Sequence, residues 1–134
     1  MIELLLFIWQ FPQNILGILL INFFRPTKIH VLDNGVCVYY SDTMMGGISL
    51  GKYCIVNSRY YRENMYESLT FSTVRHEAIG HTKQSRILGW LYLILIGLPS
   101  FLWAAIRTFG AFNNIPYHCF YTEKWADKIA NIER

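Results

Sequence analysis

Three titratable residues lie within six positions of one another: His76, Glu77 and His81 form the pattern HExxxH. Imidazoles and carboxylates are the nitrogen and oxygen ligands that Zn²⁺ takes in catalytic sites. In a regular α-helix, however, residues five apart lie about 140° apart around the axis, so His76 and His81 would not face one ion. One π-helical turn absorbs the extra residue, and Gly80 permits the backbone geometry that it needs. The spacing therefore predicts a π-turn in a helix that carries a metal site.

A second pair of carboxylates follows near the end of the chain. Glu123 and Asp127 form the pattern ExxxD, whose two side chains share one helix face. The spacing suits a Glu that binds a metal and an Asp that orients a ligand histidine through its other ring nitrogen. Beside Lys124 and Lys128 these carboxylates are also typical of a solvated helix face. Only their pairing with HExxxH favours the metal site.

HExxH followed by ExxxD is the signature of the gluzincin metallopeptidases, and the chain resembles a minimal membrane-associated member. Its longer HExxxH is similar to the HELLGH motif of the dipeptidyl peptidase III family. Residues 68–128 are also similar to a group of small uncharacterised bacterial proteins. The gluzincin resemblance implies that Glu77 is the general base, that Asp127 supports His76, and that the Zn²⁺ ligands are His76, His81 and Glu123.

The extra residue in HExxxH leaves a second geometry open. Glu77 and His81 lie four residues apart, so a regular helix would let them bind a metal together with Glu123, while His76 stood aside. The first motif would then contain no general base, and the site would be structural or regulatory. His118 is a further ligand candidate, although an ordinary hydrogen-bonded histidine is the simpler interpretation.

The other reactive side chains carry weaker signals. His30 is expected to be an ordinary hydrogen-bonded histidine on a strand. An odd set of cysteines without a C-x-x-C pair indicates reduced thiols that mostly pack in the interior, namely Cys37, Cys54 and Cys119. Among nine tyrosines, four are candidate donors to a developing oxyanion: Tyr60, Tyr61, Tyr117 and Tyr121.

Five segments would position these residues in one α+β domain that spans residues 1–134. The expected order is an apolar helical hairpin at 1–24, a small antiparallel sheet of about three strands at 25–60, the HExxxH helix at 68–86, a second apolar helical hairpin at 87–109 and the ExxxD helix at 117–134. Asn34-Gly35 is typical of a β-hairpin turn. Residues 48–57 are expected to form an extended strand, which resembles the edge strand that holds an extended peptide in such peptidases.

The apolar segments indicate a membrane. Apolar residues make up 53% of the chain and charged residues only 16%, against about 25% in soluble domains. Residues 87–106 contain no charge and have the length of a membrane span. A single crossing would place His81 and Glu123 on opposite sides of the bilayer, so the metal site requires a hairpin. We expect it to bend at Leu98-Pro99-Ser100.

The charge pattern bears on partners and location. The net charge is only +3, and the sequence contains no run of basic residues of the kind that binds a phosphate backbone, so nucleic acid is not indicated. Lys and Arg lie outside the apolar segments, which predicts a membrane-associated protein whose site faces the cytoplasm. The expected function is zinc-dependent hydrolysis of peptide bonds, with membrane lipid, a peptide or protein substrate and a second copy of the chain as expected partners. The alternative is a noncatalytic membrane interaction protein with a structural or degenerate metal site.

Overall fold

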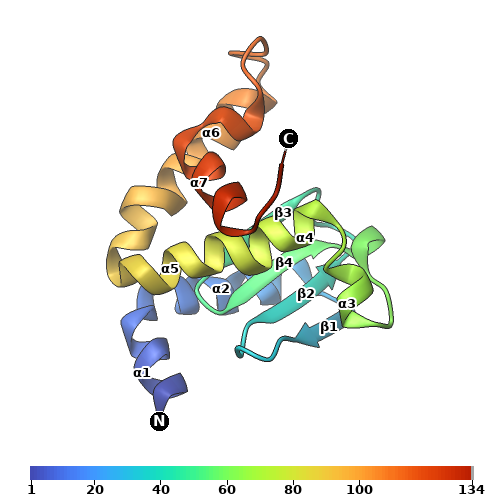
Figure 1. Cartoon of the computed structure of the whole chain (residues 1–134), viewed down its shortest axis with the longest axis vertical. Helices are drawn as coiled ribbons and strands as arrows, with labels where there is room; N and C mark the ends of the chain where they lie inside the picture. Colours follow the sequence, from blue (N-terminus) through green and yellow to red (C-terminus); the bar gives the residue numbers. More distant parts are fainter. Residues whose placement is uncertain (134) are drawn as a thin grey trace.

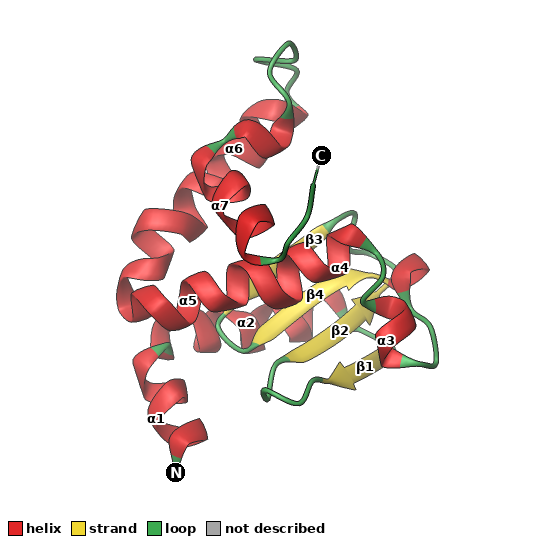
Figure 2. Cartoon of the chain, viewed as in Figure 1, coloured by secondary structure: helices red, strands yellow, loops and turns green. Residues whose placement is uncertain are grey.

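Two β-hairpins form the sheet on which the helices pack. The computed structural model describes residues 1–133 and has an α+β fold, as the sequence predicts (Figure 1, Figure 2). Strand β1 (Lys28–Val31) pairs antiparallel with β2 (Cys37–Ser41) across the predicted Asn34-Gly35 turn. Strand β3 (Gly47–Leu50) pairs antiparallel with β4 (Tyr53–Asn57). The strand order is β1-β2-β4-β3, which makes β3 an edge strand.

The sheet differs from the prediction in strand number and direction. Residues 48–57 form a hairpin rather than one strand, because Gly51 adopts a φ of +66° and turns the chain. The main-chain N–H of Lys52 donates to Asn14 Oδ1 over 2.8 Å and fixes that turn. The two central strands, β2 and β4, run parallel. Strand β4 is buried at three consecutive positions, which is typical of strands that are covered on both faces.

One helical run from Ser72 to Leu91 crosses a face of the sheet, starting four residues later than predicted. It consists of α4 (Ser72–Arg75), a π-turn (His76–His81), α5 (Thr82–Leu88) and a 3₁₀ turn (Gly89–Leu91). The predicted π-turn is thus confirmed. The run packs on the sheet through a core that contains Val38, Tyr40, Cys54, Val56, Val74 and Ala78.

Four more helices surround this core. The short helix α3 (Met65–Ser68) precedes α4. Helix α1 (Ile2–Trp9) leads into α2 (Phe11–Phe24), which contacts β3 and β4 behind the sheet (Figure 1). Helix α7 (Tyr121–Ile129) follows a 3₁₀ turn (Tyr117–Cys119) and packs on the π-turn. It is shorter than the predicted helix 117–134, and Arg134 lies outside the described residues.

The second apolar segment bends earlier than predicted. After Leu91 the chain turns by 119° into a further π-turn (Leu93–Gly97) and α6 (Leu98–Thr108). Gly89, with a φ of +56°, ends α5, whereas Pro99 lies in the first turn of α6, where its missing N–H is not needed. The expected bend at Leu98-Pro99-Ser100 is therefore wrong.

The helices of the apolar segments are short and bent. Within residues 1–133, no individual helix has both the length and the apolar character to cross a bilayer. Two bent pairs meet the criterion jointly: Ile2–Trp9 with Phe11–Phe24, at 88°, and Ser72–Leu91 with Leu93–Thr108.

Buried polar contacts fasten the N-terminal helices to α5. Gln13 Nε2 donates to Ser85 Oγ over 2.9 Å and to the Gly89 carbonyl over 2.8 Å. Two indoles tie the apolar segments together as well, because the Nε1 of Trp9 donates to Arg86 O and that of Trp90 to Ile8 O. The two apolar segments therefore form one joined unit.

Replacing Gln13 by Ala should destabilise this unit. The Gly89 carbonyl would lose a buried partner and a cavity would remain, which together cost about 2 kcal/mol. Urea unfolding of the detergent-solubilised protein, followed by tryptophan fluorescence, measures the change. Asn22→Ala is the matched control: Asn22 is exposed and bonds only within its own helix. Equal losses in both variants would contradict the bridge between α2 and α5.

Candidate metal centre

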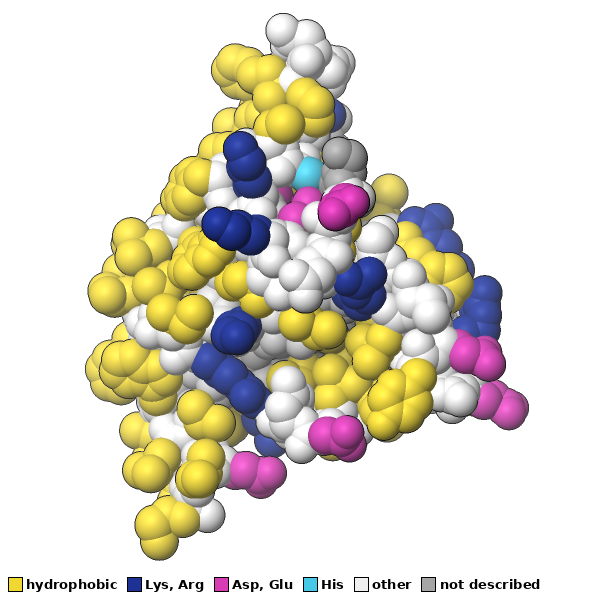
Figure 3. All heavy atoms as spheres, viewed as in Figure 1, with side chains coloured by type: hydrophobic (Ala, Val, Ile, Leu, Met, Phe, Trp, Pro, Cys, Tyr) yellow, Lys and Arg dark blue, Asp and Glu magenta, His cyan; other side chains and the backbone are white. Residues whose placement is uncertain are grey.

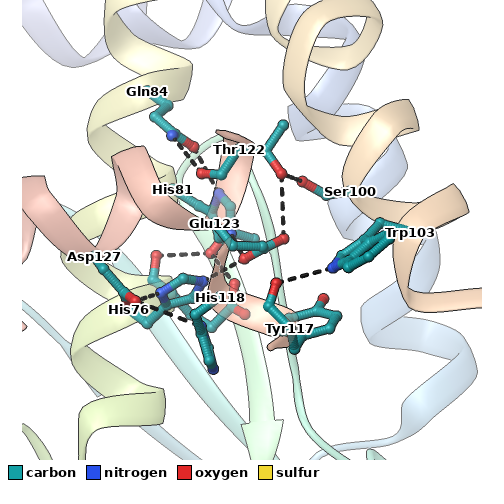
Figure 4. A network of polar contacts seen from close by, with 12 residues as sticks. His76, His81, Gln84, Ser100, Trp103, Tyr117, His118, Thr122, Glu123 and Asp127 are labelled. Carbon is teal, nitrogen blue, oxygen red and sulfur yellow. Dashed lines mark hydrogen bonds and ion pairs between the residues drawn. The ribbon is translucent and has the colours of Figure 1, made fainter. Parts of the chain in front are cut away.

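The π-turn directs two imidazoles at one oxygen atom. His76 Nε2 lies 2.6 Å from Glu123 Oε2, and His81 Nε2 lies 3.0 Å from the same oxygen (Figure 4). The two rings are nearly perpendicular, with centroids 4.7 Å apart. All three side chains are buried, and each offers a ligand atom within 4.8 Å of the others. The structure thus brings together the three residues that the motifs predict as metal ligands.

The other ring nitrogens are held by two acceptors. His76 Nδ1 lies 2.7 Å from Asp127 Oδ1, and His81 Nδ1 lies 2.6 Å from Gln84 Oε1. Gln84 Nε2 donates to the Thr122 carbonyl, which orients its oxygen toward His81. Because both acceptors require an N–H at Nδ1, a neutral imidazole presents the lone pair of Nε2 toward Glu123. That tautomer is the one that binds a metal through Nε2.

The electrostatics of the cluster are coupled. Burial alone would lower the pKa of His81, but the hydrogen bond to Glu123 and the charge of Glu77 raise it to about 9. Burial alone would also lower the pKa of His76, but the hydrogen bond to Glu123 raises it. Burial would raise the pKa of Glu123, yet the two histidines hold it well below its ordinary value. The site therefore favours an ionised carboxylate, and a cation that binds at neutral pH replaces protons on the imidazoles.

Glu77 lies beside the cluster rather than inside it. Its carboxylate lines a cavity together with His81 and Glu123. Ser49 Oγ, on β3, lies 2.9 Å from Glu77 Oε2 and 2.7 Å from its main-chain oxygen. Gly47 permits this approach, because a Cβ there would lie 2.7 Å from the Glu77 side chain. Among the described residues, two groups have ligand atoms within 4.8 Å of one another, namely His76, His81 and Glu123, and His76, His118 and Asp127. Glu77 belongs to neither.

The turn before α7 supplies a phenol and a third imidazole. Tyr117 lines the same cavity, and burial with the charges of Glu123 and Glu77 raises its pKa, so the hydroxyl keeps its proton. Trp103 Nε1 donates to the Tyr117 carbonyl and fixes the turn. His118 Nδ1 lies 3.5 Å from Asp127 Oδ2 and outside the group of His76, His81 and Glu123.

The remaining candidates lie elsewhere. Tyr60 and Tyr61 pack against the core of the sheet, and the hydroxyl of Tyr121 donates to the Leu95 carbonyl. His30 Nδ1 lies 2.9 Å from the Tyr40 hydroxyl, so the expected hydrogen-bonded histidine is confirmed. The three cysteines are free; of these, Cys54 is buried, Cys37 is partly buried and Cys119 is exposed.

The donor set fits a zinc ion. Two imidazole nitrogens and a carboxylate oxygen, with a second acceptor behind each imidazole, are the combination found in catalytic zinc sites. The alternative set of Glu77, His81 and Glu123 is not the one that the structure gathers. No family model, no curated protein and no solved structure matches the chain. The likeness to gluzincins therefore rests on the motifs and on this geometry.

Two contributors were missed by the sequence analysis. Gln84, three residues after His81, holds that imidazole, and Ser49 bonds the Glu77 carboxylate from the sheet. The spacing of Gln84 could have suggested its role, because residues three apart share a helix face. Nothing in the local sequence relates Ser49 to Glu77, since their contact depends on how the helix crosses the sheet.

Gly80→Ala should weaken zinc binding by about 10- to 100-fold. A Cβ at Gly80 would lie 2.5 Å from the Ala126 carbonyl oxygen, so α7 must move away and carry Glu123 with it. Competition against a chelating dye measures the affinity. Gly46→Ala is the matched control, because a Cβ there meets no atom within 4 Å. Unchanged affinity in Gly80→Ala would show that the contact does not position Glu123.

Proposed function

We propose that the protein is a membrane-associated, gluzincin-like zinc metallopeptidase that hydrolyses peptide bonds. The observation that carries the proposal is the convergence of two histidine nitrogens on one Glu123 oxygen, with Glu77 beside them at a cavity and outside this group. His76, His81 and Glu123 would hold the zinc, and Asp127 would support His76. When bound, the zinc supplies the Lewis acid that activates water and polarises the scissile carbonyl.

The surrounding side chains suit the proton transfers of hydrolysis. Glu77 accepts a proton from the attacking water as the water oxygen bonds to the carbonyl carbon. Glu77 then donates this proton to the leaving amine as the C–N bond breaks. The products are a carboxylate and an amine. Tyr117 keeps its phenolic proton and faces the same cavity, so it suits the role of donor to the developing oxyanion.

Edge strand β3 suits a substrate in an extended conformation. All four of its residues line the cavity beside Glu77. A peptide that pairs with its main chain would lie next to the metal cluster, with alternate side chains directed into the cavity. Main-chain pairing with β3 would position the scissile bond without a charged pocket that binds a substrate side chain.

The apolar surface supports attachment to one face of a bilayer. Figure 3 shows hydrophobic side chains along the left edge, over α1 and the run from α5 into α6, while Lys and Arg lie across the rest of this face. Exposed apolar side chains cover α1, α2 and α6, and contiguous apolar surfaces are typical of contacts with lipid or a partner. All twelve Lys and Arg lie outside residues 1–24 and 87–106. We therefore infer that the site faces the cytoplasm.

We expect about one zinc per chain, which Glu123→Ala or His81→Ala should remove. Each variant deletes one of three protein ligands, and the remaining two do not hold the ion against a chelator. Metal analysis of the purified protein after dialysis measures the stoichiometry. His30→Ala should keep its zinc, because His30 lies on β1 and belongs to neither group of possible metal ligands. Full stoichiometry in both ligand variants would overturn the assignment.

Glu77→Gln should keep zinc but reduce peptide hydrolysis by about 10²- to 10⁴-fold, because an amide cannot accept the proton of water. Cleavage of a mixed peptide library, followed by mass spectrometry, measures the activity, and metal analysis of the same sample measures the zinc. Loss of zinc from Glu77→Gln but not from His76→Ala would make Glu77 a ligand. The noncatalytic alternative, with a structural or degenerate site, would then stand.

A further inference from the structure

The cavity at the metal cluster has one polar end and otherwise apolar walls. Its volume is about 620 Å³, within the usual range for ligand sites. Glu77, His81, Tyr117 and Glu123 form the polar end. The rest is lined mainly by aliphatic and aromatic side chains of α2, β3 and the run from Leu93 to Ala104. A substrate here would place its reacting bond at one end and bury apolar groups along the remainder.

The cavity wall is continuous with the exposed apolar surface. Leu98 and Ile94 line the cavity, yet they remain 55% and 65% exposed. The same is true of Phe101, which stands on the next turn of α6. The cavity therefore opens through the surface that carries the apolar side chains, and a ligand need not cross the charged part of the molecule to reach Glu77.

The lining also restricts the kind of peptide. No Lys or Arg stands among the described residues that line the cavity, so a free carboxylate in its apolar part, away from His81, would have no counter-ion. An internal peptide segment carries no such charge. In lipid, its extended main chain must find hydrogen-bond partners. The edge strand β3 lines the cavity, where the Tyr92 hydroxyl already donates to the Ser49 carbonyl, so a peptide would pair with the rest of this edge.

We propose, on the basis of the proposed function, that the substrates are membrane-inserted apolar peptides. They reach the metal cluster sideways from the bilayer and are cut within an internal segment. The apolar side chains next to the scissile bond occupy the space between α2 and α6, with Leu98 and Ile94 at the opening. Peptides that stay in water bind poorly, because the opening lies in the lipid-facing surface.

Matched variants on the same helices test this proposal. Leu98 and Leu102 both lie on α6 and are 55% and 50% exposed, but only Leu98 lines the cavity. Ile94 and Leu95 form a second pair, 65% and 45% exposed, of which only Ile94 lines it. Within each pair, replacement of either residue by Asn should lower the membrane affinity of the protein by a similar amount. All four side chains are substantially exposed, so the variants should fold.

The probe is a lysine-flanked apolar peptide of about 20 residues, long enough to insert in a bilayer. It carries a dansyl group and is mixed with the full chain, as Glu77→Gln, in phosphatidylcholine and phosphatidylglycerol vesicles. Energy transfer from tryptophan measures its binding without cleavage. A peptide of equal length, with serine and threonine in place of the apolar residues, is the water-soluble control.

We expect Leu98→Asn and Ile94→Asn to weaken binding of the apolar peptide about tenfold, and Leu102→Asn and Leu95→Asn to leave it nearly unchanged. Equal weakening within each pair would show an effect of membrane affinity alone and overturn the proposal. Equal binding of the soluble peptide would also overturn it. Peptide binding is measured here without turnover. A failure of zinc loading or of hydrolysis would therefore contradict the proposed function, whereas a failure of peptide binding would contradict only the inference about the substrate.

Discussion

One buried carboxylate oxygen, Glu123 Oε2, fixes where the surrounding elements must lie. An unpaired charge at this depth would cost several kcal/mol, and removing one partner of a buried pair typically costs about 3–5 kcal/mol. Both imidazoles must therefore reach it, which requires the π-turn on one side and α7 on the other. Gly80 allows the contact between them, because its missing side chain admits the Ala126 carbonyl. The helix that holds the histidines and the helix that holds the glutamate thus depend on one interaction.

The sheet performs a different task from the helices around the cluster. Its central strands β2 and β4 anchor the run from Ser72 to Leu91 through Val74 and Ala78, and β4 is buried at three consecutive positions. Its edge strand β3 meets that run at Glu77, where Ser49 bonds the carboxylate. Glu77 is therefore positioned by the sheet and the two ligand histidines by α7. Under the proposed function, this separation lets Glu77 exchange a proton while His76, His81 and Glu123 hold the zinc.

The sequence predicted those features that depend on neighbours along the chain. The spacing of HExxxH required a π-turn if both histidines faced one metal ion, and the resemblance to gluzincins implied that Asp127 supports His76. The Asn34-Gly35 turn was equally local. The parallel pair β2 and β4, the bond from Ser49 to Glu77 and the bend near Gly89 depend on contacts distant in sequence or on one backbone angle. Pro99 misled the prediction because proline is as compatible with a first helical turn as with a bend.

The early bend joins α6 to the cluster of His76, His81 and Glu123. A bend at Leu98-Pro99-Ser100 would have extended the site helix past the cluster and carried Leu98 away from it. Because the chain instead turns after Leu91, α6 returns toward α7, where Ser100 Oγ donates to Thr122 Oγ1 over 2.8 Å. That bond lies one residue from Glu123, so α6 is joined to the ligand helix while its outer side chains remain exposed. The apolar surface and the cluster of His76, His81 and Glu123 consequently share one wall, so a displacement of α6 would act directly on the cavity beside Glu77.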